Sequence, residues 1–142
     1  MIMLTAFNRM LDKPDLGKLL LRFTFGAMML FHGIHKLLFG INGIIGMVQA
    51  HGMPAIVAYG VFLGEIIVPL MFIFGILVRP AALIFAFTML FAWLITEPGI
   101  IFTLTNVGAW GLENIAVYLF AGLAIALLGC GRYSVMSNPA WR

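Results

Sequence analysis

Charged residues are scarce in this sequence. Only 9% of its 142 residues are Asp, Glu, Lys or Arg, whereas 63% are hydrophobic, and the mean hydropathy is +1.12. An apolar content this high excludes an ordinary soluble fold. The net charge of +3 is too small and too dispersed to form a nucleic-acid-binding surface. We therefore expect no nucleic-acid partner, and we expect the lipid bilayer to be the main surrounding of the chain.

Cysteine is also nearly absent, because Cys130 is the only one. A single cysteine cannot form an intramolecular disulfide, a CxxC redox pair or a thiolate-rich metal site. The sequence lacks the GxGxxG pattern of a dinucleotide-binding fold and the CxxCH pattern of covalently attached haem. We therefore expect no covalently bound cofactor, and any redox chemistry would need electrons from a partner.

Four apolar stretches are long enough to cross a membrane, which takes about 20 residues in a helix. They run approximately over residues 16–39, 54–78, 80–96 and 112–129. Gly40 interrupts the chain after the first stretch, and Glu97-Pro98-Gly99 ends the third. The sequence therefore predicts an all-α fold in one domain over residues 1–142, an integral membrane four-helix bundle.

Positive charges are missing from two of the three connections between these stretches. Residues 40–53 and 97–111 contain no Lys or Arg. If the chain crosses the membrane four times, these two connections lie on one side of the membrane. The Lys and Arg residues that precede, join or follow the four stretches then all lie on the other side: Arg9, Lys13, Lys18, Arg79, Arg132 and Arg142. By the positive-inside rule, this asymmetry predicts that both termini lie in the cytoplasm.

Five ionisable side chains nevertheless lie within the first two stretches: Arg22, His32, His35, Lys36 and Glu65. A charged group at the bilayer centre costs about 2.5–3.5 kcal/mol on insertion scales. Such groups usually face the bundle interior, pair with one another or serve a site. These five residues are therefore the first candidates for a functional site.

The first stretch carries a polar stripe on one helical face. At about 100° per residue, one stripe combines Arg22, Gly26, Met29, Gly33 and Lys36. Gly26 and Gly33 would let a neighbouring helix approach closely. We expect this stripe to be a buried seam, with His32 beside it and His35 pointing away.

Glu65 lies near the middle of the second stretch, where a short acidic side chain cannot reach water. We therefore expect a partner, and the candidates are Arg22, Lys36 and His32. Pro69 has no N–H to bond the Glu65 carbonyl four residues earlier, which leaves a further acceptor beside the carboxylate. A structural Glu–Arg clamp between helices and a functional role both fit this pattern.

Further polar residues open the fourth stretch, where Glu113 and Asn114 are followed one turn later by Tyr118. We predict that Glu65 exchanges protons. The predicted substrate-binding residues are Arg22, His32, Lys36, Glu113, Asn114 and Tyr118. No metal site is predicted, because the i,i+3 spacing of the weak candidates His32 and His35 is insufficient by itself.

The order of several motifs resembles that of the DoxX family. They are Leu21-Arg22 with Gly26, His32-Gly33 with Lys36, Gly64-Glu65 with Pro69, then Gly75, Arg79-Pro80 and the closing Gly129-Cys130-Gly131-Arg132-Tyr133-Ser134. The last is similar to the family's Gly-x-Gly-Arg-aromatic-Ser signature, although Val135-Met136 stands where the family usually has Leu-Asp. The resemblance implies a small four-helix protein of the bacterial inner membrane.

The resemblance also suggests functions. Relatives include a membrane subunit of a thiosulfate:quinone oxidoreductase, which implies a membrane subunit or partner of a redox system that binds a quinone-like molecule. If the chain is part of an enzyme, it is expected to be an oxidoreductase subunit with a protein partner in the membrane or periplasm. The alternatives are a non-catalytic membrane anchor or assembly partner, and a small transporter or metal-handling protein. A homo-oligomer is compatible with each of these functions.

Overall fold

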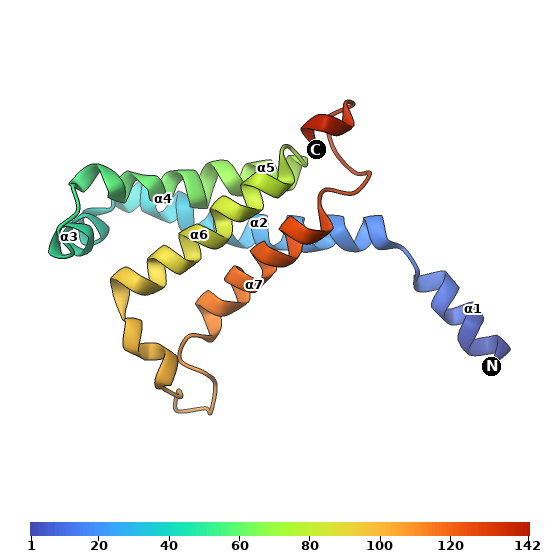
Figure 1. Ribbon diagram of the computed structural model, residues 1–142, viewed down its shortest axis with the longest axis horizontal. Coiled ribbons are helices and arrows are strands. Elements are labelled where there is room, and N and C mark those ends of the chain that lie inside the picture. Colours follow the sequence, from blue (N-terminus) through green and yellow to red (C-terminus); the bar gives the residue numbers. More distant parts are fainter.

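The computed structural model describes residues 1–142 and is built from helices, with one isolated β-bridge between Leu104 and Trp110. Four long helical segments dominate the fold (Figure 1): α2 (Pro14–Phe39), a composite helix over Ala55–Phe74, α6 (Val78–Thr96) and α7 (Glu113–Leu128). Their bounds lie within a few residues of the four stretches expected from the sequence. The all-α prediction is confirmed.

The composite helix changes its winding along its length. It consists of η1 (Ala55–Tyr59), α4 (Gly60–Phe62), η2 (Leu63–Ile67) and α5 (Val68–Phe74). The η2 segment is a π turn, in which the Val68 N–H donates to the Leu63 carbonyl. Pro69 follows this turn and cannot donate to the Glu65 carbonyl. Single π turns inside helices are frequent at functional sites, and this one carries Glu65.

The connection between α5 and α6 is tight. Gly75 ends α5 in the left-handed conformation with φ of 74°, and its N–H donates to the Met71 carbonyl. A side chain at this position would also lie 2.9 Å from the Cys130 Sγ atom. Glycine is therefore required here by both backbone conformation and space. The result is a tight antiparallel hairpin between the composite helix and α6.

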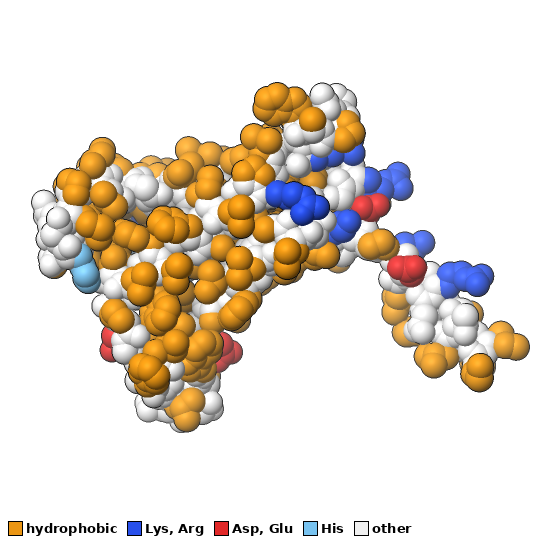
Figure 2. All heavy atoms as spheres, viewed as in Figure 1, with side chains coloured by type: hydrophobic (Ala, Val, Ile, Leu, Met, Phe, Trp, Pro, Cys, Tyr) orange, Lys and Arg blue, Asp and Glu red, His pale blue; other side chains and the backbone are white.

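The apolar surface identifies a helical membrane protein. The composite helix and α6 are each long and apolar enough to cross a bilayer, and α2 with α3 (Asn42–Ala50) adds a third such segment if this pair, bent by 96°, is taken as one span. Figure 2 shows hydrophobic side chains over the middle of the molecule, with Lys and Arg side chains gathered towards the end that holds both termini. Phe31, Phe87 and Leu127 are 75%, 65% and 80% exposed. Apolar surface of this extent is suited to lipid rather than water.

The buried residues of α2 are Arg22, Gly26, Met29 and Gly33, which confirms four of the five members of the predicted stripe; the fifth, Lys36, is half-buried. A Cβ atom on Gly26 would lie 3.0 Å from the Pro69 carbonyl oxygen. The absence of a side chain therefore lets α2 and α5 approach closely, as small residues do between membrane helices.

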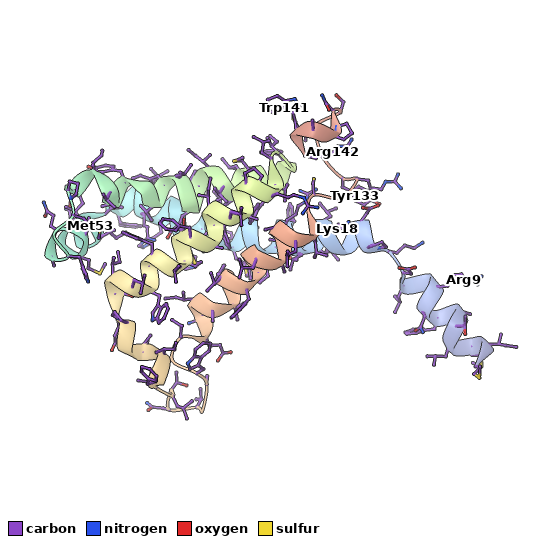
Figure 3. The ribbon with its side chains drawn as sticks, in the orientation of Figure 1. Arg9, Lys18, Met53, Tyr133, Trp141 and Arg142 are labelled. Carbon is purple, nitrogen blue, oxygen red and sulfur yellow. The ribbon has the colours of Figure 1, made fainter.

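The remaining elements lie at the ends of the bundle. The amphipathic helix α1 (Ile2–Leu11) has no buried residue and extends away from the other helices, with Arg9 on it (Figure 3). At the opposite end, near the labelled Met53, α3 packs against α6 through Val48 and Ile95. The connection before α7 contains η3 (Pro98–Phe102), and η4 (Pro139–Trp141) lies near the C-terminus.

Candidate functional site

The ion pair of the structure joins Lys36 of α2 to Glu65 of η2. The Lys36 Nζ atom lies 2.5 Å from each of the Glu65 carboxylate oxygens. The carboxylate is the more deeply buried partner, with 7% of the Glu65 side chain exposed against 26% for Lys36. Of the three partners that the sequence suggests for Glu65, the structure selects Lys36.

Two glycines bring three helices together around Glu65. A side chain on Gly33 of α2 would collide with the Glu65 carbonyl, and one on Gly64 would collide with Thr88 of α6. Both contacts are possible only because these positions lack a Cβ atom. The π turn therefore lies directly against α2 on one side and α6 on the other.

A first cavity, here called the apolar cavity, extends from the ion pair between α3, the composite helix and α6. Its volume is about 380 Å³, and 11 of its 16 lining residues are hydrophobic. Lys36 and Glu65 are its only charged residues, and Thr88 and Thr96 supply hydroxyl groups. An apolar pocket with a few polar groups is the usual form of a small-molecule site.

A second cavity, here called the polar cavity, lies between α2, α6 and α7. Its volume is about 410 Å³, and five of its eight lining residues are hydrophobic; the polar groups are those of His32, Glu65 and Asn114 and the Tyr118 hydroxyl. The His32 and Tyr118 rings meet edge to face, with centroids 6.3 Å apart. Glu65 lines both cavities, so it lies where the two approach each other.

The structure thus gathers most of the residues predicted for a site. Lys36 lies at the apolar cavity, and His32, Asn114 and Tyr118 lie at the polar cavity, with Glu65 between them. Glu113 is exposed at the start of α7 and lines neither cavity. The two weak metal candidates also diverge, because the His35 ring packs against Phe39, with centroids 4.6 Å apart. No group of three or more His, Cys, Asp or Glu side chains is arranged to hold a metal ion.

Arg22 occupies a different place from Glu65. It lies fourteen residues before Lys36 on the same face, which is about 21 Å along a helix. This distance explains why the two groups share a stripe but not a site. Arg22 lines neither cavity, and its side chain is 1% exposed.

The Arg22 guanidinium binds backbone carbonyls instead of a carboxylate. It donates to Phe72 and Ile73 in the last turn of α5, and to Cys130 and Tyr133 after α7. Carbonyls at a helix C-terminus lack intrahelical partners and carry the negative end of the helix dipole. Arg22 therefore caps α5 and fixes the segment that follows α7.

That segment, residues 129–142, forms a C-terminal strap across the end of the bundle. The Ser134 hydroxyl donates to the Gly75 carbonyl at 2.7 Å, and the Val135 N–H donates to the Phe74 carbonyl at 3.0 Å. The Arg132 N–H donates to the Asp15 carboxylate at 3.2 Å. A Cβ atom on Gly131 of the strap would lie 3.2 Å from the Lys18 side chain of α2, and Figure 3 labels Lys18 and Tyr133 at this end of the bundle.

Sequence reasoning missed Thr88 and Ala92 of α6, which line the apolar cavity; Ala92 also lines the polar cavity. Their spacing of four residues places both on one helical face. The available sequence signal was that a small residue and a hydroxyl residue share one face of a helix that is otherwise rich in Phe and Leu. The position of the cavities themselves depends on helix tilt, which the residue pattern does not encode.

These features define a class of protein, a helical membrane protein with an ion pair held between its helices beside an apolar cavity. The DoxX family model matches residues 17–98, more than half of the chain, and the chain belongs to the DoxX family. The matched region contains Arg22, Lys36 and Glu65, and it ends before α7 and the strap. No curated protein and no solved structure matches the chain.

Proposed function

We propose that this protein is a membrane subunit or partner of a redox system, and that its apolar cavity binds a quinone or a similar lipid-soluble molecule. The observation that carries the proposal is the Lys36–Glu65 pair at the edge of an otherwise apolar cavity. A quinone combines an apolar body with carbonyl oxygens that require hydrogen-bond donors. The Lys36 ammonium group has three N–H donors. Glu65 does not occupy all of them, so a donor remains for a quinone oxygen.

The chemistry of quinones also suits the carboxylate. Reduction of a quinone to a quinol takes up two electrons and two protons. In this proposal a protein partner supplies the electrons, and Glu65 transfers protons to the quinone oxygens. A carboxylate positioned within reach of the reacting oxygen is an effective group for this transfer.

The membrane arrangement that we propose has four spans, with both termini in the cytoplasm of a bacterial inner membrane. The gathering of Lys and Arg side chains at the end with both termini supports this orientation (Figure 2). The 16 residues of α7 extend about 24 Å, less than the hydrocarbon thickness of about 30 Å. Local thinning of the bilayer or the flanking residues compensates for such a difference.

Access from the lipid fits a bilayer-soluble ligand. Leu63 and Phe87 both line the apolar cavity and are 43% and 65% exposed. The cavity therefore reaches the apolar surface of the helices. A molecule dissolved in the bilayer would enter here without crossing water.

Titration of the purified protein in lipid nanodiscs with decylubiquinone tests this function. Gly60 lines the cavity, and a Cβ atom placed on it meets no other atom within 4 Å, so Gly60→Phe should place a ring at the cavity without a collision. We expect this variant and Glu65→Gln to bind at least about tenfold more weakly, a change of about 1.4 kcal/mol. The matched control is Gly17→Phe, which also has open space around it and lines neither cavity. Equal binding by Gly60→Phe and the control would refute the proposal.

A second candidate function is a non-catalytic membrane anchor or assembly partner, which the position of the ion pair favours. Lys36 and Glu65 connect α2 to the composite helix, as a structural clamp would. Buried ion pairs can often be replaced by apolar residues without loss of stability. The double variant Lys36→Met, Glu65→Met separates the two functions. If the folded double variant loses decylubiquinone binding, the first function is supported. If the ion pair is only a structural clamp, the folded double variant should bind decylubiquinone and other molecules as the parent protein does.

A further inference from the structure

Glu65 borders two cavities that differ in what they can hold. The apolar cavity reaches the lipid-facing surface through Leu63 and Phe87. The polar cavity is lined by Met29, Met89, Ala92 and Ile115 and also by an imidazole, an amide and a phenol, and two of the polar residues, His32 and Asn114, are exposed. Asn114 stands one residue after the start of α7, at the end of the bundle opposite the Lys and Arg side chains.

We propose that the polar cavity is a hydrated vestibule through which Glu65 exchanges protons with the aqueous phase on the periplasmic side. This inference rests on the membrane arrangement proposed above, and it deepens the proposed function by separating the path of the proton from the path of the ligand. The ligand reaches Glu65 from the bilayer, and the proton reaches it from water.

The size of the polar cavity and the polar groups in its lining suit water. A volume of about 410 Å³ holds on the order of ten water molecules, since each occupies about 30 Å³ of liquid. Buried water is stable where two to four polar groups are available to it. The side chains of His32, Asn114, Tyr118 and Glu65 provide such groups at the boundary of the cavity.

Packed aromatic rings close the path from Glu65 towards the other end of the bundle. Phe72 and Phe85 have no exposed surface, and their ring centroids lie 5.2 Å apart. Phe85 also contacts Tyr118, with centroids 6.1 Å apart. The Phe72 and Phe85 rings are fully buried and offer no polar group that would hold water on the Arg22 side of Glu65, so the vestibule is the hydrated route to the carboxylate.

The ionisable groups near Glu65 come from two helices. Lys36 and His32 lie on α2, and Tyr118 lies on α7. On α6 the only ionisable residue is Arg79, at the far end, and Thr88 supplies the nearby hydroxyl.

In the proposed step, a proton from the vestibule binds a Glu65 carboxylate oxygen. This removes the negative charge that holds Lys36, and the freed ammonium group can donate to a ligand carbonyl. Once the protein partner has supplied electrons to the ligand, transfer of the proton from Glu65 to the reduced ligand oxygen restores the carboxylate and the ion pair.

Cysteine labelling tests the vestibule directly. Cys130 is buried and is the only cysteine, so Cys130→Ser gives a background without native thiols. A charged, membrane-impermeant methanethiosulfonate is added to right-side-out vesicles and reacts with thiolates, which form only in contact with water. We expect Tyr118→Cys to react at least about tenfold faster than Val117→Cys, which is the adjacent, lipid-facing position at 48% exposure. The second matched pair compares the labelling rate of His32→Cys with that of Phe31→Cys at the adjacent position, where Phe31 is 75% exposed.

Two results distinguish this inference from the proposed function. If Tyr118→Cys and His32→Cys react no faster than their neighbours while the parent protein binds decylubiquinone, the vestibule is refuted and the ligand site stands. If both react rapidly while the parent protein binds no decylubiquinone, the vestibule is supported and the quinone function fails. Size-exclusion profiles matching that of the background protein identify the variants that are folded.

A second measurement follows the proton itself. The infrared band of the protonated Glu65 carboxyl, identified by its loss in Glu65→Gln, shifts when deuterium replaces the proton. In acidic buffer we expect this exchange to be at least about tenfold slower in Asn114→Leu, which removes a polar group from the vestibule. Unchanged exchange in that variant would contradict the proposed route.

Discussion

Substitution of Arg22 by methionine removes a buried guanidinium that binds four backbone carbonyls. The Cys130 and Tyr133 carbonyls belong to the strap and can reach water if the strap detaches. The Phe72 and Ile73 carbonyls stay at the end of α5 without partners. At about 1–3 kcal/mol for each unsatisfied group, the expected loss in the free energy of unfolding is about 2–6 kcal/mol. Arg22→Lys should lose less, because lysine keeps the charge but not the planar set of donors.

Arg79→Met is the matched control for this change. The Arg79 guanidinium also donates to two carbonyls, those of Ala126 and Leu127, but its side chain is exposed. Water can replace these hydrogen bonds, so the expected loss is at most about 0.5 kcal/mol. The difference between the two variants isolates the effect of burial.

Unfolding by SDS in mixed micelles, followed by far-UV circular dichroism, measures both variants. Limited proteolysis then reports whether residues after Gly129 are released in Arg22→Met. The reasoning is refuted if Arg22→Met unfolds within about 0.5 kcal/mol of Arg79→Met and the strap is cleaved no faster than in the parent protein.

Two further predictions concern helix packing and orientation. Gly33→Leu should lower the yield of monodisperse protein in size-exclusion chromatography, because the new side chain meets the Glu65 carbonyl, whereas Gly17→Leu has open space and should match the parent protein. Equal yields would contradict the packing. A reporter active only in the cytoplasm should function when fused to either terminus and fail when inserted at Gly108. Activity at Gly108 would overturn the proposed orientation.

Local sequence patterns account for much of the fold. The helix bounds follow from apolar length, and the buried face of α2 follows from the spacing of Arg22, Gly26, Met29 and Gly33. Both properties depend on residues within a few turns of one another. The close approach at Gly33 was predictable for the same reason, since a small residue on a buried face permits contact whatever the partner.

The candidate site was less accessible to sequence reasoning. The sequence offered Arg22, Lys36 and His32 as partners of Glu65, and the choice of Lys36 depends on how far α2 is shifted along the composite helix. The acceptors of Arg22 after α7 lie 108 and 111 residues away in the chain. No local pattern connects such positions. The two cavities arise from the angles between helices, which are set by all the contacts together.

The strap has a consequence for the order in which the protein is made. Arg22 is synthesised early, and its first acceptors, the carbonyls of Phe72 and Ile73, follow 50 and 51 residues later. Its last acceptors, at Cys130 and Tyr133, are translated only after α7 is complete. The cationic side chain therefore stays incompletely bound during most of translation. Closure of this end of the bundle is a late step in biogenesis, and a ribosome stalled before Cys130 would leave it open.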